Sequence, residues 1–105
     1  MADQIVVWSP EALEDVDAIA AYIARDSVFY AAAVVEKMLA AAADLNRFPQ
    51  AGRVVPELNQ PDVRERFVYS YRLIYRIEPQ RILVTAVIHG KRLLEDATVE
   101  RLAGT

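Results

Sequence analysis

The chain has 105 residues, of which 54% are hydrophobic and 26% are charged. A chain of this length buries roughly two-thirds of the surface that it exposes when unfolded, so one core can form without metals or disulfides. The absence of Cys excludes structural disulfides, thiolate metal sites and thiol nucleophiles. We expect a single domain over residues 1–105, with a core over residues 4–93 and a short C-terminal tail.

No stretch approaches the roughly 20 apolar residues that a membrane span requires, because even the Ala-rich run 31–43 contains Glu36 and Lys37. The N-terminus carries Asp3 in place of a cationic patch, and no apolar signal core follows it. We therefore expect a cytoplasmic protein that does not bind membranes.

The net charge of −3 is unevenly distributed along the chain. Residues 1–46 hold eight acidic and two basic residues, a balance of −6, whereas residues 47–105 hold ten basic and seven acidic residues, a balance of +3. The C-terminal half would therefore face an anionic partner. A dedicated nucleic-acid binder is usually basic throughout its domain, so direct nucleic-acid binding is not expected.

The N-terminal part of the chain is predicted to form a strand followed by a helix. Residues 4–8 are mostly apolar and β-branched, and Ser9 and Pro10 then supply an N-cap and a first helical residue. The helix is predicted to end near Arg25, with its acidic residues Glu14, Asp15 and Asp17 turned outward. Its apolar stripe consists of Leu13, Val16, Ile19, Ala20 and Ile23.

A second, longer helix is predicted to begin at a cap on Asp26 or Ser27 and to stop before Pro49. The short link to the first helix predicts an antiparallel helical hairpin. The apolar stripe of the second helix consists of Val34, Val35, Met38, Leu39, Ala42 and Leu45.

The second half of the chain changes to β-branched and aromatic segments, which predict strands at 64–69, 72–77 and 82–89. Residues 78–81 are a plausible hairpin turn, and the nearly continuous apolar run 82–88 predicts a central strand. Turn formers predict surface connections at 48–53 and 59–62. Residues 93–103 are predicted to form a short helix or a loose tail. The fold class is α+β: an N-terminal strand, the helical hairpin and a three-stranded antiparallel meander that completes one small sheet.

Several segments, taken together in their order and spacing, resemble the RelE/ParE toxin superfamily over roughly residues 4–93. They are Trp8-Ser9-Pro10, the helical pair, 48–53, Val55-Pro56-Glu57-Leu58, Arg64-Glu65, 71–76 and 88–92. The segments 49–57 and 64–76 are more similar to the ParE branch than to the RelE branch. The resemblance implies the toxin of a type II toxin-antitoxin system, which inhibits DNA gyrase by protein binding and is neutralised by a cognate antitoxin.

The RelE branch supplies the alternative, a ribosome-dependent messenger endoribonuclease that uses no metal. RNA cleavage needs a base, cations that stabilise the phosphorane, and an acid for the leaving oxygen. No Tyr follows His89, and Glu95 and Asp96 would repel a phosphate, which counts against this activity. The residues that cleavage would use are Arg64, Arg72, Arg76 and His89. A third alternative is a degenerate, non-toxic member that only binds the antitoxin.

Basic residues of the C-terminal half are the candidates for binding a target or the antitoxin: Arg64, Arg66, Arg72, Arg76, Lys91 and Arg92. Side chains alternate along a strand, so Arg72 and Arg76 share one face of their strand, and Arg64 and Arg66 share a face of theirs. A short basic strip across the paired strands is one interpretation. The others are a solvated face, or a rim that pairs with Glu57, Glu65 or an acidic partner.

The remaining candidate residues, one His and three Tyr, are also explained by structural roles. His89 ends an apolar strand, where a His that satisfies a backbone carbonyl is commoner than a catalytic one. Tyr69, Tyr71 and Tyr75 could stack on bases, but we expect two of the three to lie in the core.

No other chemistry is supported by the sequence. A lone His without Cys does not make a usual zinc site, and three Gly cannot build a phosphate cradle. We therefore expect no metal, no cofactor and no catalytic residue, and a protein that acts by binding. The antitoxin would lay an amphipathic helix or extended segment over the helical hairpin and the sheet, and an acidic stretch of it would meet the basic strip.

Overall fold

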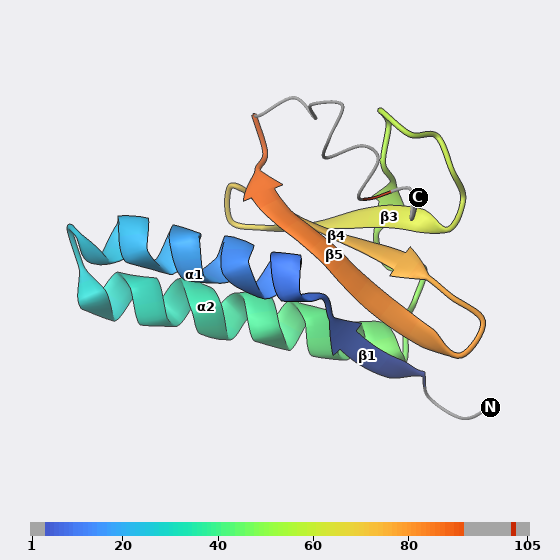
Figure 1. Ribbon diagram of the computed structural model, residues 1–105, viewed down its shortest axis with the longest axis horizontal. Coiled ribbons are helices and arrows are strands. Elements are labelled where there is room, and N and C mark those ends of the chain that lie inside the picture. The colour runs from blue at the N-terminus through green and yellow to red at the C-terminus, as the bar shows by residue number, and fades with distance from the viewer. Residues whose placement is uncertain (1–3, 92–101, 103–105) are drawn as a thin grey trace.

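Two helices lie against one face of a five-stranded sheet (Figure 1). The computed structural model describes residues 4–91 and Leu102. The sheet has the order β1-β5-β4-β3-β2, in which β1 pairs with β5 in parallel and all other neighbours are antiparallel. The elements are β1 (Ile5–Trp8), α1 (Pro10–Ala24), α2 (Val28–Ala43), the 3-10 turn η1 (Asp44–Asn46), β2 (Arg53–Val54), β3 (Val63–Val68), β4 (Tyr71–Ile77) and β5 (Arg81–His89). The predicted α+β fold is confirmed.

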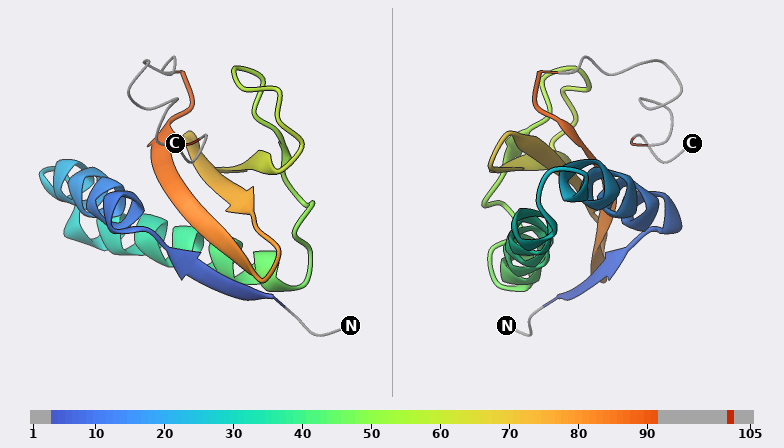
Figure 2. Two further views of the ribbon diagram at one scale, coloured as in Figure 1. Left: turned by 45° about the vertical axis from the view of Figure 1, so that its right-hand side comes forward. Right: turned by 90° about the vertical axis from the view of Figure 1, so that its left-hand side faces the viewer.

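Both helices begin at serine caps. The Ser9 hydroxyl accepts the backbone N–H of Ala12 at 3.1 Å, and the Ser27 hydroxyl accepts that of Tyr30 at 3.0 Å. The second cap is therefore Ser27, one of the two residues expected there. Residues 25–27 join the helices, which run antiparallel and side by side, as the predicted hairpin requires (Figure 2). In the part of the chain that the structure describes, no helix is long and apolar enough to cross a membrane.

The three C-terminal strands form the predicted meander, and β5 lies inside the sheet between β1 and β4. The turn between β4 and β5 is closed by the N–H of Glu78, which donates to the carbonyl of Arg81 at 2.9 Å. Strand β2 was not predicted. The expected surface connection 48–53 ends at Arg53, but Arg53 and Val54 pair with residues 64–65 of β3 at the edge of the sheet.

The sheet has a different environment on each face. On the helix-covered face, Val34 and Met38 of α2 pack with Leu73 and Tyr75 of β4 in the larger hydrophobic cluster. On the opposite face, a smaller cluster contains Val55, Val63, Ile74, Ala86 and Leu102. The buried apolar stripe of each helix is narrower than predicted, because the side chains of Leu13 in α1 and Leu39 in α2 are each 47% exposed.

Asp15 was predicted to face solvent, but it contacts the sheet. Its Oδ2 accepts the backbone N–H of Val87 at 3.0 Å. The last residue of β1, Trp8, pairs with Val84, so β5 continues past the end of its neighbour. Asp15 thus satisfies a backbone donor that β1 is too short to reach. The predicted tail at 93–103 lies outside the described residues except for Leu102, and Arg92 also lies outside them.

Candidate functional site

The two predicted arginines of β3 lie on the helix-covered face. Arg66 donates to the carbonyl of Ala41 in α2 at 3.2 Å and lies 3.8 Å from the carboxylate of Asp44. Arg64 donates to the carbonyl of Gly52 at 3.0 Å and also to that of Pro61. Both side chains are therefore engaged with the backbone of neighbouring segments.

The two arginines of β4 lie on the opposite face. Arg64 pairs with Tyr75 and Arg66 with Leu73, whereas Arg72 pairs with Phe67. Because side chains alternate, Arg72 and Arg76 share the face of Ile74 rather than that of Leu73 and Tyr75. The single basic strip across paired strands does not form, because the register places its members on two faces of the sheet.

Arg72 is buried in a cluster of ion pairs, which we call the ion-pair cluster: Arg53, Glu57, Glu65 and Arg72. The two terminal nitrogens of Arg72 donate to the two carboxylate oxygens of Glu57, each at 2.8 Å, and its Nε donates to Glu65 at 2.5 Å. The Glu65 side chain has no exposed surface, and its second oxygen accepts the Nε of Arg53 at 2.7 Å. Pairing with Glu57 and Glu65, one of the alternatives considered from the sequence, is thus observed for Arg72.

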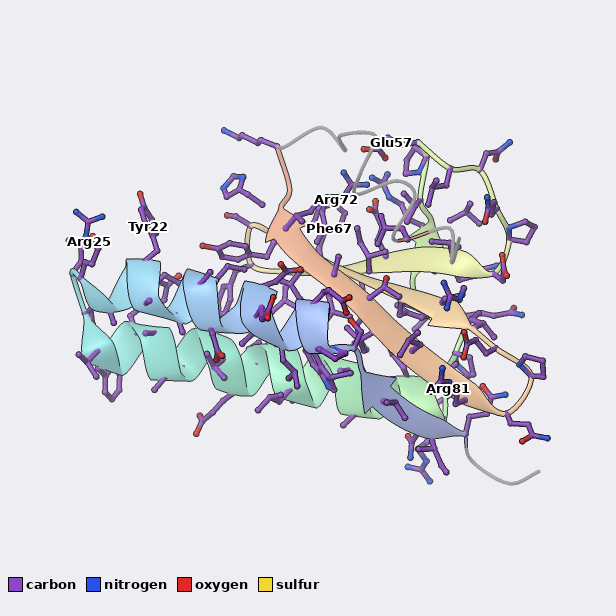
Figure 3. The ribbon with its side chains drawn as sticks, in the orientation of Figure 1. Tyr22, Arg25, Glu57, Phe67, Arg72 and Arg81 are labelled. Carbon is purple, nitrogen blue, oxygen red and sulfur yellow. The ribbon has the colours of Figure 1, made fainter. Side chains whose placement is uncertain are left out.

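Within the ion-pair cluster, the hydrogen bonds between Arg72 and Glu57 favour the charged forms of these two residues. The hydrogen bonds from Arg72 lower the pKa of Glu57 against the opposing effect of burial. The hydrogen bond to Glu57 is likewise the largest cause of the raised pKa of Arg72. Figure 3 shows Glu57, Arg72 and Phe67 near one another, away from the helix end that carries Tyr22 and Arg25.

Arg76 is also paired. Its Nε and one terminal nitrogen donate to Glu78 at 2.9 and 2.8 Å, and the Arg76 side chain is only 18% exposed. Arg81 donates to the other oxygen of Glu78 at 2.5 Å. The hydrogen bond from Arg81, followed by that from Arg76, lowers the pKa of Glu78.

His89 lies at an exposed end of β5. Its Nδ1 accepts the backbone N–H of Lys91 at 3.2 Å, whereas the sequence suggested that the ring would serve a backbone carbonyl. The ring also packs edge-to-face on Tyr71, with centroids 5.6 Å apart. His89 pairs with Tyr71 on the helix-covered face, and Arg72 and Arg76 lie on the opposite face. The four residues proposed for RNA cleavage do not converge.

Two of the three tyrosines belong to the core, as expected. Tyr75 is fully buried, and its hydroxyl donates to the carbonyl of Pro49 at 2.7 Å and accepts the N–H of Gly52 at 2.9 Å. Burial raises the pKa of this hydroxyl. Tyr71 packs against the larger cluster, and Tyr69 is 55% exposed at the β3–β4 turn.

Two grooves with mainly apolar lining flank the helical hairpin. The α1–β5 groove has a volume of about 510 Å³ and is lined by Asp15, Ala18, Ile19, Tyr22, Tyr71, Val87, Ile88 and His89. The hairpin groove has a volume of about 520 Å³ and is lined by Ala20, Ala21, Ala24, Val28, Ala31, Ala32, Val35 and Glu36. Sequence reasoning did not find the α1–β5 groove, because its walls come from segments about 50 residues apart. The hairpin groove was not predicted either, although the small side chains of the Ala residues in both helices are a signal in the sequence that could have located it.

Large exposed side chains belong to the walls of the grooves, as Tyr22 and Val28 do, or adjoin them in sequence, as Phe29 does. Tyr22, whose ring is 6.0 Å from the Cζ of Arg25, is 68% exposed on α1 (Figure 3). Phe29 and Val28, at the start of α2, are 87% and 73% exposed. Large exposed apolar side chains beside apolar grooves are typical of a surface that binds another protein. Within residues 4–91, no group of three or more acidic or His side chains comes together to hold a metal ion.

Comparison with solved structures confirms the RelE/ParE-like fold. The chain is similar to a chain of the chromosomal ParDE toxin-antitoxin system from P. aeruginosa, with a TM-score of 0.68 and 19% identity over 82% of this chain and 95% of that one. It is also similar to a chain of the toxin-antitoxin complex RelBE2 from Mycobacterium tuberculosis, with a TM-score of 0.57 and 26% identity over 85% and 93% of the two chains. The YoeB dimer from Staphylococcus aureus gives a TM-score of 0.58 and 17% identity over 84% and 98%.

Comparison with sequences identifies the branch. A search of curated protein sequences gives no significant match. Residues 6–94, however, match the family described as the ParE toxin of the type II toxin-antitoxin system parDE. The matched region includes both helices and every strand except the first residue of β1. The chain therefore belongs to the ParE toxin family of type II toxin-antitoxin systems, within the RelE/ParE superfamily.

Proposed function

We propose that this ParE family member acts by protein binding in the cytoplasm, that its target is DNA gyrase, and that a cognate antitoxin neutralises it. The observation that carries the proposal is the family match over residues 6–94. The P. aeruginosa and M. tuberculosis structures similar to this chain are themselves described as toxin-antitoxin systems or complexes, which supports an antitoxin partner.

The arrangement of the charged residues supports binding over RNA cleavage. A phosphorane would need free cations and a proton donor around one point. Here Arg72 and Arg76 are bound to carboxylates on one face, while His89 lies on the other. An endoribonuclease would have to break these ion pairs before it could use the two arginines.

The helical hairpin offers the surface for an antitoxin. An amphipathic helix of the antitoxin would place its apolar side chains in the α1–β5 groove or the hairpin groove and cover the exposed aromatic residues around them. Covering this surface would exclude gyrase if the same residues contact the enzyme, so antitoxin and gyrase would compete for the toxin.

Expression in bacteria tests the proposal at the level of the cell. The chain is induced alone and together with the product of the neighbouring reading frame. Growth arrest with induction of the DNA-damage response, relieved by co-expression, is the expected result. Normal growth at a verified level of folded protein would contradict a toxic function. Arrest without DNA damage, accompanied by messenger cleavage, would favour the endoribonuclease.

A further inference from the structure

Arg53 has an exposed guanidinium that is hydrogen-bonded to a buried carboxylate. Its Nε donates to the carboxylate of Glu65 at 2.7 Å. The Glu65 side chain has no exposed surface, whereas that of Arg53 is 60% exposed. The buried carboxylate therefore fixes the orientation of a cationic group that faces solvent.

The guanidinium of Arg53 also contacts an aromatic ring. Its Cζ lies 5.4 Å from the ring centroid of Phe67, which is 51% exposed. Arg53 pairs with Glu65 across β2 and β3, and Phe67 follows Glu65 by two residues, so all three side chains share one face. The edge of the ring also packs close to Gly90, where a β-carbon would lie 3.2 Å from Phe67 Cε1. The same β-carbon would lie even closer, at 2.9 Å, to the carbonyl oxygen of Ser70, so Gly90 leaves room for the β3–β4 turn as well as for the ring that supports Arg53.

The neighbouring charges explain why Arg53 remains available. Glu65 uses one carboxylate oxygen for Arg72 and the other for Arg53. Arg72 in turn directs its two terminal nitrogens to Glu57. The terminal nitrogens of Arg53 make no hydrogen bond to any residue that the structure describes, so their four N–H groups remain available to a further acceptor.

We propose that Arg53 is a binding residue for a carboxylate, contributed by an Asp or Glu side chain of the antitoxin, with Phe67 as the adjoining apolar contact. A planar guanidinium with two free terminal nitrogens can hold a carboxylate through two parallel hydrogen bonds. Its orientation is already fixed by Glu65 and Phe67, which lowers the entropic cost of binding. The inference rests on the proposed function, because it specifies the chemistry of the antitoxin segment.

A peptide carboxylate fits this surface better than a nucleic acid. Binding to a polyanion depends on several cations that each neutralise a phosphate. Among the residues of the ion-pair cluster, Arg72 is bound to two carboxylates and only Arg53 faces solvent with free donors. One oriented guanidinium beside an aromatic ring matches a single acidic side chain with an apolar neighbour.

The test measures the affinity of the antitoxin, purified as the product of the neighbouring reading frame, for four variants by calorimetry. Arg53→Gln removes the charge, and Arg53→Lys keeps the charge but lacks the planar fork. Arg81→Gln and Arg81→Lys are the matched controls, since Arg81 is also exposed and paired with a glutamate but lies at the β4–β5 turn. Denaturant unfolding of each variant verifies that it is folded.

We expect Arg53→Gln to weaken binding about 10- to 100-fold and Arg53→Lys to weaken it less, while both controls stay within about twofold. The antitoxin's affinity for the wild-type toxin should fall with added salt, and this dependence should be reduced in Arg53→Gln. Arg53→Lys retains a cation beside the buried Glu65. If Arg53→Gln does not fold, the affinity of the antitoxin for Arg53→Lys therefore tests the inference.

Binding of both Arg53 variants within twofold of wild type would overturn the inference while leaving the proposed function intact. Failure of the wild-type toxin to bind this antitoxin at all would instead contradict the proposed function. A loss of affinity in the Arg81 controls equal to that in the Arg53 variants would also overturn the inference, because it would indicate a general effect of surface charge.

Discussion

The two faces of the sheet are stabilised in different ways. The helix-covered face buries a large apolar cluster in which Met38, Leu73 and Tyr75 are fully buried. The opposite face has a smaller apolar cluster beside an arginine and a glutamate that are almost completely buried, Arg72 and Glu65. On the opposite face, therefore, a positive charge does not by itself mark a surface residue. Arg72 is buried and Arg76 is mostly covered, whereas Arg53 on the same face is exposed.

The largest effect should come from breaking the ion-pair cluster. Arg72→Ala leaves the buried carboxylate of Glu65 with Arg53 as its single cationic partner, so the free energy of unfolding should fall by about 3–5 kcal/mol. Urea unfolding of the purified variant measures the loss. The control Arg81→Ala breaks a pair at an exposed turn and should cost less than about 1 kcal/mol. Equal losses would mean that burial does not distinguish the two sites.

Truncation of adjacent residues in β4 compares the two apolar clusters. Leu73→Ala on the helix-covered face should cost about 2–5 kcal/mol, because a fully buried side chain leaves a cavity under the helices. Ile74→Val on the opposite face removes one methylene and should cost about 0.5–1.5 kcal/mol. Denaturant unfolding gives both values. A larger loss for Ile74→Val would show that the smaller cluster contributes more to stability than the helix-covered core.

The hydroxyl of Tyr75 connects the helix-covered core to the segment before β2. Tyr75→Phe should cost about 1–3 kcal/mol, because the N–H of Gly52 and the carbonyl of Pro49 lose their partner in the interior. Tyr69→Phe, at an exposed position, should change stability by less than about 0.5 kcal/mol. Thermal or urea unfolding of the two variants provides the comparison. If both hydroxyls prove equally dispensable, Tyr75 does not hold this segment.

Acid should weaken the opposite face. The pKa values of Glu57 and Glu78 are lowered in the folded protein from an ordinary value of 4.5, so the unfolded chain takes up protons first. Their contribution to stability is complete above that value and is lost as the pH falls through the lowered pKa values. Urea midpoints between pH 7 and pH 3 should decline, and Glu57→Gln should start lower at pH 7 and decline less. A parallel decline in Glu57→Gln would exclude Glu57 as a cause.

The sequence predicted the elements well because their signals are local. The caps at Ser9 and Ser27, the helical spacing between them and the apolar run of β5 all depend on residues close together in the chain. Strand β2 has only two residues and forms through pairing with β3, so residues 53–54 carry no periodicity that could reveal it. The contact of Asp15 with the sheet also has no local signal, because its partner Val87 is 72 residues away in the sequence.

The candidate site was predicted less completely, because it depends on register. Alternation correctly placed Arg72 with Arg76, but the relation between β3 and β4 depends on the turn that joins them. Val68 pairs with Tyr71, so the turn consists of Tyr69 and Ser70 alone. Tyr69 has a φ of 53°, a conformation usually taken by Gly or Asn, so the sequence lacks the usual hairpin signal. Without that signal, the split of the arginines between two faces could not be derived. The position of Arg53 depends on the pairing of β2 with β3, which no local pattern reveals.

The most direct test of action by protein binding is a supercoiling assay with purified DNA gyrase, run beside a translation reaction that reports messenger cleavage. We expect the chain to inhibit supercoiling in proportion to its concentration, added antitoxin to relieve the inhibition, and the messenger to stay intact. Unchanged supercoiling together with messenger cleavage that is abolished by His89→Ala would contradict it.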